Sequence, residues 1–89
     1  MSTDELRTAH ERLLDARQKA TGTAATRLDT LCAQVSNAVD DGRHLDHGQL
    51  ARMMNTLAEL REDEAGDAAE AISTARHALA TYREGIEGV

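Results

Sequence analysis

The chain repeats itself after 44 residues, and the repeat includes the signals that begin a helix. Met1-Ser2 and Glu5-Leu6 fall on Leu45-Asp46 and Gln49-Leu50. Apolar and glycine positions recur at the same offset, as in Leu13/Leu57, Gly22/Gly66, Leu28/Ile72 and Val35/Leu79. A period close to half the chain length indicates two copies of one supersecondary unit. We therefore expect a single domain, 1–89, that is an internal duplication of 1–44 and 45–89.

The composition favours helices over strands. The 89 residues include no Pro, Phe or Trp, and Tyr82 is the only aromatic residue. The apolar residues are mostly Ala, Leu, Met and Val, which suit closely packed helices, and no β-branched run alternates with period two. We therefore predict an all-α fold.

Each half carries an apolar stripe with a period of 3.6 residues. The first stripe consists of Leu6, Ala9, His10, Leu13, Arg17, Ala20, Ala24, Leu28, Leu31, Val35 and Ala38, and the second of Leu50, Met53, Met54, Leu57, Leu60, Arg61, Glu64, Ala68, Ile72, Ala75, Leu79, Tyr82 and Ile86. The stripes keep their phase, and the segment between them is short. This pattern predicts an antiparallel helical hairpin of two long arms, about 3–41 and 46–84.

Capping residues mark the ends of these arms. Ser2 with Glu5, and Asp46 with Gln49, have the spacing of a capping box, so we expect each pair to begin a helix. Gly42 is suited to the left-handed position that follows a helix C-terminus.

Two glycines make a second architecture possible. Gly22 and Gly66 interrupt the arms, and Asp67-x-x-Glu70 resembles a further capping box. A glycine inside a helix costs only about 1 kcal/mol, so a long arm can be kinked there without ending. The alternative is a four-helix bundle in which the chain turns at both glycines.

The charge of the chain restricts its partners. Sixteen Asp and Glu residues oppose ten basic residues, nine of them Arg, for a net charge of −6. Nucleic acids and anionic membranes would repel such a surface, so we expect neither as a partner. A Lys-poor, acidic surface is also typical of a cytoplasm with molar salt, where charges are screened within about 3 Å. The N-terminus lacks a secretory signal pattern, which predicts a cytoplasmic protein.

Several residues could in principle carry chemistry. His44, Asp46 and His47 surround the central turn and are candidate metal ligands, although Asp46 is also the expected cap. His10 and His77 would face one another at the open end of a hairpin. The acidic residues between 59 and 70 have helical spacing, which favours a solvated face over a calcium loop. Cys32 is single and lies beside the stripe, which favours a packing role. We expect no catalytic residue, no cofactor and no metal.

A two-helix hairpin leaves part of each stripe uncovered, and association would cover it. The candidate interaction residues are Leu14, Leu31, Met53, Met54 and Leu60. The simplest expectation is a homodimer that forms a four-helix bundle, or a complex with another helical protein. We therefore predict a non-enzymatic interaction or structural module. The alternative is a small metal- or ligand-responsive regulator that uses His44 and His47, or His10 and His77.

Three segments resemble a known family. They are 45–57 (LDHGQLARMMNTL), Gly66-Asp67-Ala68-Ala69-Glu70, and Tyr82-Arg83. Together with the break at Gly22, they are similar to a domain of unknown function found in small acidic helical proteins from haloarchaea. The resemblance covers most of the chain and concerns caps and packing positions. It implies the helical architecture and a high-salt cytoplasm, and it implies no functional residues.

Overall fold

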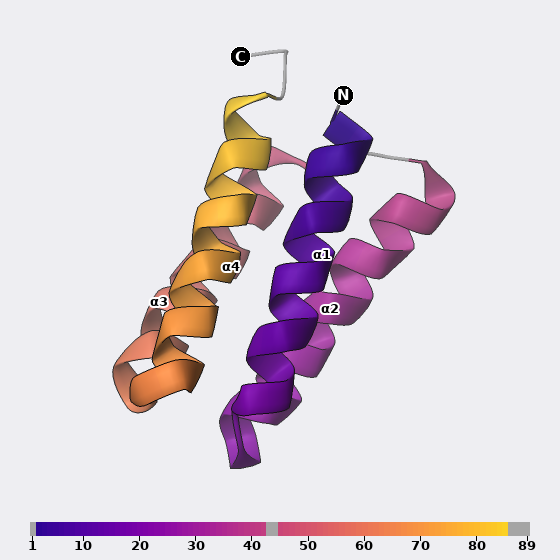
Figure 1. Cartoon of the computed structure of the whole chain (residues 1–89). Helices are drawn as coiled ribbons and strands as arrows, with labels where there is room; N and C mark the ends of the chain where they lie inside the picture. The colour runs from indigo at the N-terminus through magenta and orange to yellow at the C-terminus, as the bar shows by residue number, and fades with distance from the viewer. Residues whose placement is uncertain (1, 43–44, 86–89) are drawn as a thin grey trace.

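The structure is a computed structural model that describes residues 2–42 and 45–85. Within this part of the chain it contains helices and no strands, which confirms the all-α prediction. Figure 1 shows the four helices, which are α1 (Ser2–Lys19), α2 (Gly22–Asp41), α3 (His47–Asp63) and α4 (Gly66–Glu84).

The chain reverses direction at both mid-arm glycines. Gly22 and Gly66 have φ angles of 60° and 61°, a left-handed conformation that glycine adopts without steric cost. The residues before them match as well, since Thr21 has φ −133° and ψ 164° and Ala65 has φ −141° and ψ 166°. The expected weak points are therefore two copies of one tight turn. Of the two predicted architectures, the four-helix bundle describes the path of the chain, because each arm is folded back on itself.

The helices alternate in direction, and their packing is uneven. Helix α1 packs against both α2 and α4, and α4 packs against both α1 and α3. Helices α2 and α3 touch each other only slightly. Figure 1 shows α1 and α4 side by side, with the N-terminal end of α1 and the C-terminal end of α4 at the same end of the bundle. The arrangement is thus a ring of four helices with one open seam.

The core follows the 44-residue repeat. Both members of the matched pairs are buried at Leu6/Leu50, Ala9/Met53, Leu13/Leu57, Ala16/Leu60, Ala24/Ala68, Leu28/Ile72, Leu31/Ala75, Val35/Leu79 and Ala38/Tyr82. Arg17, which the sequence placed in the stripe, is exposed, and Ala16 takes the buried position beside it. The described residues include no buried charged side chain. Packing between the repeats is therefore almost entirely apolar.

The predicted caps have three different outcomes. Asp46 is the N-cap of α3 and accepts a hydrogen bond from the backbone N–H of Gln49 at 2.7 Å, as predicted. Gly42 follows α2 in the left-handed conformation, with φ 66°, also as predicted. The capping box at Asp67 is wrong, because the N-cap of α4 is Ala65, two residues earlier, which offers no side-chain acceptor. The Ser2 cap lies outside the side chains that the structure describes.

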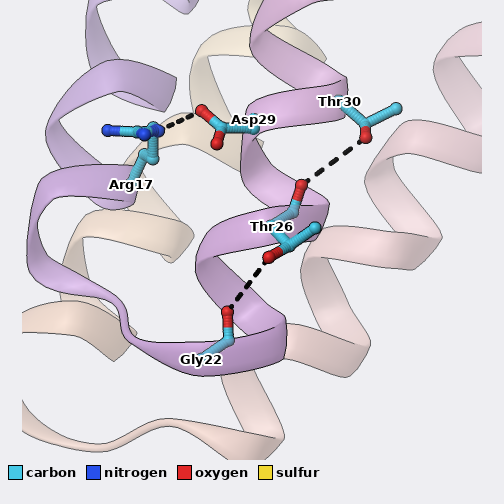
Figure 2. A network of polar contacts seen from close by, with 5 residues as sticks. All are labelled: Arg17, Gly22, Thr26, Asp29 and Thr30. Carbon is cyan, nitrogen blue, oxygen red and sulfur yellow. Dashed lines mark hydrogen bonds and ion pairs between the residues drawn. The ribbon is translucent and has the colours of Figure 1, made fainter.

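Polar contacts occur both within and between the elements of the bundle. Arg17 on α1 forms an ion pair with Asp29 on α2, close to the first glycine turn (Figure 2). Figure 2 also shows Thr26 and Thr30 of α2, whose hydroxyls donate to the carbonyls of Gly22 and Thr26 at 3.4 and 3.5 Å. At the other end, the Tyr82 hydroxyl accepts a hydrogen bond from the N–H of Leu45 at 3.3 Å. This last contact anchors the segment before α3 to the end of α4.

Candidate functional site

The predicted interaction residues divide into two groups. Leu31, Met53 and Leu60 are buried in the core, with 5%, 2% and 2% of their surfaces exposed. These three side chains present little apolar area at the surface of the single chain, because turning at the glycines brings a second pair of helices over them, and their role in an interaction stays a prediction. Met54 is half-buried against the core, and Leu14 is 39% exposed. Among the described residues, Leu14 is the large apolar side chain left most open to solvent.

Of the histidine candidates, the structure describes His10 on α1, His47 at the start of α3 and His77 on α4. Asp46 caps α3, His47 lies in its first turn, and His44 lies outside the described residues. No group of three His, Cys, Asp or Glu residues suited to a metal ion occurs in residues 2–42 and 45–85. His77 lines a groove between α1 and α4, but His10 is not among the residues that line it. The metal-dependent alternative stays a prediction.

A groove follows the open seam between α2 and α3. It encloses about 280 Å³. Its lining comes equally from the two helices and consists of Arg27, Thr30, Leu31, Gln34, Gln49, Arg52, Met53 and Thr56. Leu31 and Met53 are nearly inaccessible and form its floor, while the exposed and half-buried polar side chains form its walls. A site with an apolar floor and polar walls can hold side chains of another protein.

A second groove is related to the first by the duplication. It lies between α1 and α4 and encloses about 330 Å³. Its lining is Glu5, Thr8, Arg12, Thr74, His77, Ala78 and Thr81. Thr74 and Ala78 are 44 residues after Thr30 and Gln34, and Thr8 is 44 residues before Arg52. The two grooves therefore occupy equivalent positions in the two seams that the duplication relates.

The two seams differ in the size of their side chains. Leu31 and Met53 at the floor of the α2–α3 groove correspond to Ala75 and Ala9 in the other seam. At the groove walls the change occurs in the pairs Gln34/Ala78 and Arg52/Thr8, whereas Thr56 corresponds to the larger Arg12. The distance between packed helices depends on the side chains at the contact, so alanines allow close approach and larger residues prevent it. This difference explains why α1 and α4 pack closely while α2 and α3 stand apart.

The electrostatics of the α2–α3 groove contrast with the acidic chain around it. None of its eight lining residues is a carboxylate, and two are arginines. Arg27 on α2 contacts Glu59 on α3 at 3.2 Å, and this pair bridges the seam near the start of α2 and the end of α3. Arg52 is exposed and has no hydrogen-bond or ion-pair partner among the residues that the structure describes. The groove therefore has Arg52 toward the start of α3 and Arg27 toward the end of α3, where Arg27 is paired with the 67% exposed Glu59 beside the groove.

Two buried groups have shifted pKa values. Burial raises the pKa of the Cys32 thiol, and the nearby Asp29 carboxylate adds to the increase, whereas Arg17 opposes it. Burial also raises the pKa of Tyr82, while the hydrogen bond from Leu45 lowers it. Both groups are held in their neutral forms by the core. They serve packing in this structure, as expected for Cys32.

The open seam could be predicted from the sequence by comparing the side-chain sizes of residues that match in the 44-residue repeat. Comparing positions 44 apart, rather than reading each stripe alone, sets Ala75 against Leu31 and Ala9 against Met53. The arginines of the groove are harder to find, because Arg27 and Arg52 lie 25 residues apart, on helices that come side by side only after the chain turns between α2 and α3.

Fold and groove together define a class of protein, a duplicated antiparallel four-helix bundle with one open seam. The chain belongs to a family of unknown function, DUF7553, whose model matches residues 1–85. No curated protein and no solved structure matches it. Within the described residues, no helix is long and apolar enough to cross a membrane.

Proposed function

We propose that this protein is a non-enzymatic helical interaction module whose binding surface is the α2–α3 groove. The observation that carries the proposal is the open seam. The side chains Leu31 and Met53 hold α2 and α3 apart, and polar groups with hydrogen-bonding capacity line the gap. A helical protein, either another copy of the chain or a different one, would insert side chains between these walls. Polar walls would make such an interface more polar than that of an obligate complex.

The surface charge supports a working environment of high salt. Every described carboxylate is exposed or half-buried, and the net charge is −6. At low salt these carboxylates repel one another and destabilise the folded state, whereas at about 1 M salt the repulsion is screened within about 3 Å. We expect the melting temperature to rise as KCl is increased to molar concentration. A melting temperature that is flat or falls would argue against the high-salt cytoplasm.

A matched pair of variants tests the interaction surface. Thr30 lines the α2–α3 groove, and Thr74 is its counterpart in the α1–α4 groove. Both are exposed, and both donate their hydroxyl to a carbonyl four residues earlier. Thr30→Glu and Thr74→Glu therefore make the same local change in the two seams.

The measurement is capture of proteins from a high-salt lysate of the native cells by immobilised wild type and by each variant. We expect Thr30→Glu to lose a protein that both the wild type and Thr74→Glu retain. The proposal fails if all three retain the same proteins, because the α2–α3 groove would then play no part in binding.

A further inference from the structure

We propose that a second copy of this chain docks antiparallel on the α2–α3 face, with Arg52 of each copy paired to Glu59 of the other. This inference rests on the proposed function and names the partner of the same groove. It follows from the positions of charged side chains along the seam.

The two charges lie on one face of α3. They are seven residues apart, which is two helical turns, or about 10.5 Å along the axis. Arg52 lines the groove, and Glu59 contacts Arg27, which also lines it. The face therefore carries a positive group toward the start of α3 and a negative group toward its end.

A two-fold axis that crosses the middle of the seam at right angles to the helices makes the charges of this face complementary to those of a second copy. An antiparallel copy of α3 places its own end over the start of the first α3, so Arg52 faces the partner's Glu59 twice, in a reciprocal contact. The same axis places α2 of one copy against α2 of the other. The Arg27–Glu59 contact fixes the register of α2 on α3, and Gln34 lies about level with Arg52. The same rotation therefore brings Arg27 toward the partner's Gln34, whose carbonyl can accept its hydrogen bond.

A second copy of the chain supplies the opposite charge to both Arg52 and Glu59. Arg52 has no partner among the described residues, and Glu59 keeps 67% of its side chain exposed while it contacts Arg27. The Glu59 carboxylate of the second copy would form an ion pair with Arg52, and the Arg52 guanidinium of the second copy would form an ion pair with Glu59. The α1–α4 face has no such pattern, since the matching positions are Thr8 and Asp15.

Charge-reversal variants test this docking. Arg52→Glu makes both positions negative and Glu59→Arg makes both positive, so each homodimer would place like charges together, which is strongly unfavourable at an interface. We expect each variant to weaken the homodimer at least about tenfold. An equimolar mixture of the two variants has opposite charges at both contacts, and we expect it to form a heterodimer about as tight as the wild-type dimer.

The measurement is sedimentation equilibrium at the lowest KCl concentration that keeps the wild type helical by circular dichroism. Arg12→Glu, an exposed substitution in the counterpart groove, is the control and should dimerise like the wild type. The inference is overturned if the wild type is monomeric at all concentrations, if Arg52→Glu dimerises as tightly as the wild type, or if the mixture forms no heterodimer. A monomeric wild type that still captures a Thr30-dependent protein from lysate would overturn the second copy as partner and leave the proposed function intact.

Discussion

The α1–α4 and α2–α3 seams occupy equivalent positions in a duplicated chain and both carry a groove, yet α1 and α4 pack closely (the closed seam) while α2 and α3 touch only slightly (the open seam). The glycine turns have nearly identical backbone angles in both halves, and the buried stripe recurs almost position by position. The floors of the seams differ in side-chain size, because Ala9 and Ala75 stand opposite Met53 and Leu31 in the alignment of the repeats. The lesson is that a duplicated backbone plan can yield one structural contact and one available surface through a few changes in residue volume.

Transferring the large residues to the closed seam should have the largest effect. Ala9→Met with Ala75→Leu places the residues of the open seam between α1 and α4, at two fully buried positions. Inserting methylenes into a packed core costs about 1–3 kcal/mol at each site. We expect the double variant to lose at least about 3 kcal/mol of unfolding free energy in urea titrations. A loss below about 0.5 kcal/mol would show that the closed seam has spare volume, contrary to the account.

The reverse exchange should cost less. Leu31→Ala removes a buried side chain from the floor of the open seam, and such changes cost about 2–5 kcal/mol depending on how well the site collapses. Helices α2 and α3 barely touch, so they can approach each other after truncation, and we expect a cost of about 2 kcal/mol. A cost near 5 kcal/mol in the same titration would mean that the seam cannot close.

The two glycine turns should respond alike. A methyl group added at Gly22 or Gly66 meets no atom within 4 Å, so the cost of Gly→Ala comes from the left-handed backbone alone, about 1 kcal/mol. Gly48 provides the control, because it lies inside α3 without a positive φ and a methyl group there makes ordinary contacts, so Gly48→Ala should stabilise slightly. Thermal unfolding of the three variants compares them. Unequal losses at positions 22 and 66 would contradict the equivalence of the turns.

The smallest effect concerns Cys32, whose counterpart in the second half is the exposed Arg76. Its pKa in the folded state is raised above the ordinary thiol value of 9.0. The unfolded state therefore loses this proton first as the pH rises, and the stability that the buried thiol contributes below that pKa is lost above it. We expect unfolding free energy to fall above pH 9, and to fall less in Cys32→Ser. Parallel pH profiles of the two proteins would show that the thiol is not responsible.

Sequence reasoning reached the elements more easily than their arrangement. The Asp46 cap, the Gly42 terminus and most of the buried stripe could be read from local pattern, because they depend on neighbouring residues. The continuity of the apolar stripe through Gly22 favours long arms. The turn there has only two residues between α1 and α2, so the apolar period continues in α2 although the chain has reversed direction. Local periodicity does not distinguish a kink from a reversal. The groove depends on side-chain size at matched positions of the two halves, which the apolar pattern of a single stripe does not report.

Amide hydrogen exchange tests the central claim most directly, because the open seam assigns different surroundings to helices that the duplication makes equivalent. Helices α1 and α4 each pack against two neighbours, whereas α2 and α3 each pack closely against one. At a concentration where the chain is monomeric, we expect amides in the middle of α1 and α4 to exchange more slowly than those of α2 and α3. Protection that instead follows the repeat, with α1 like α3 and α2 like α4, or that is uniform over all four helices, would contradict the account.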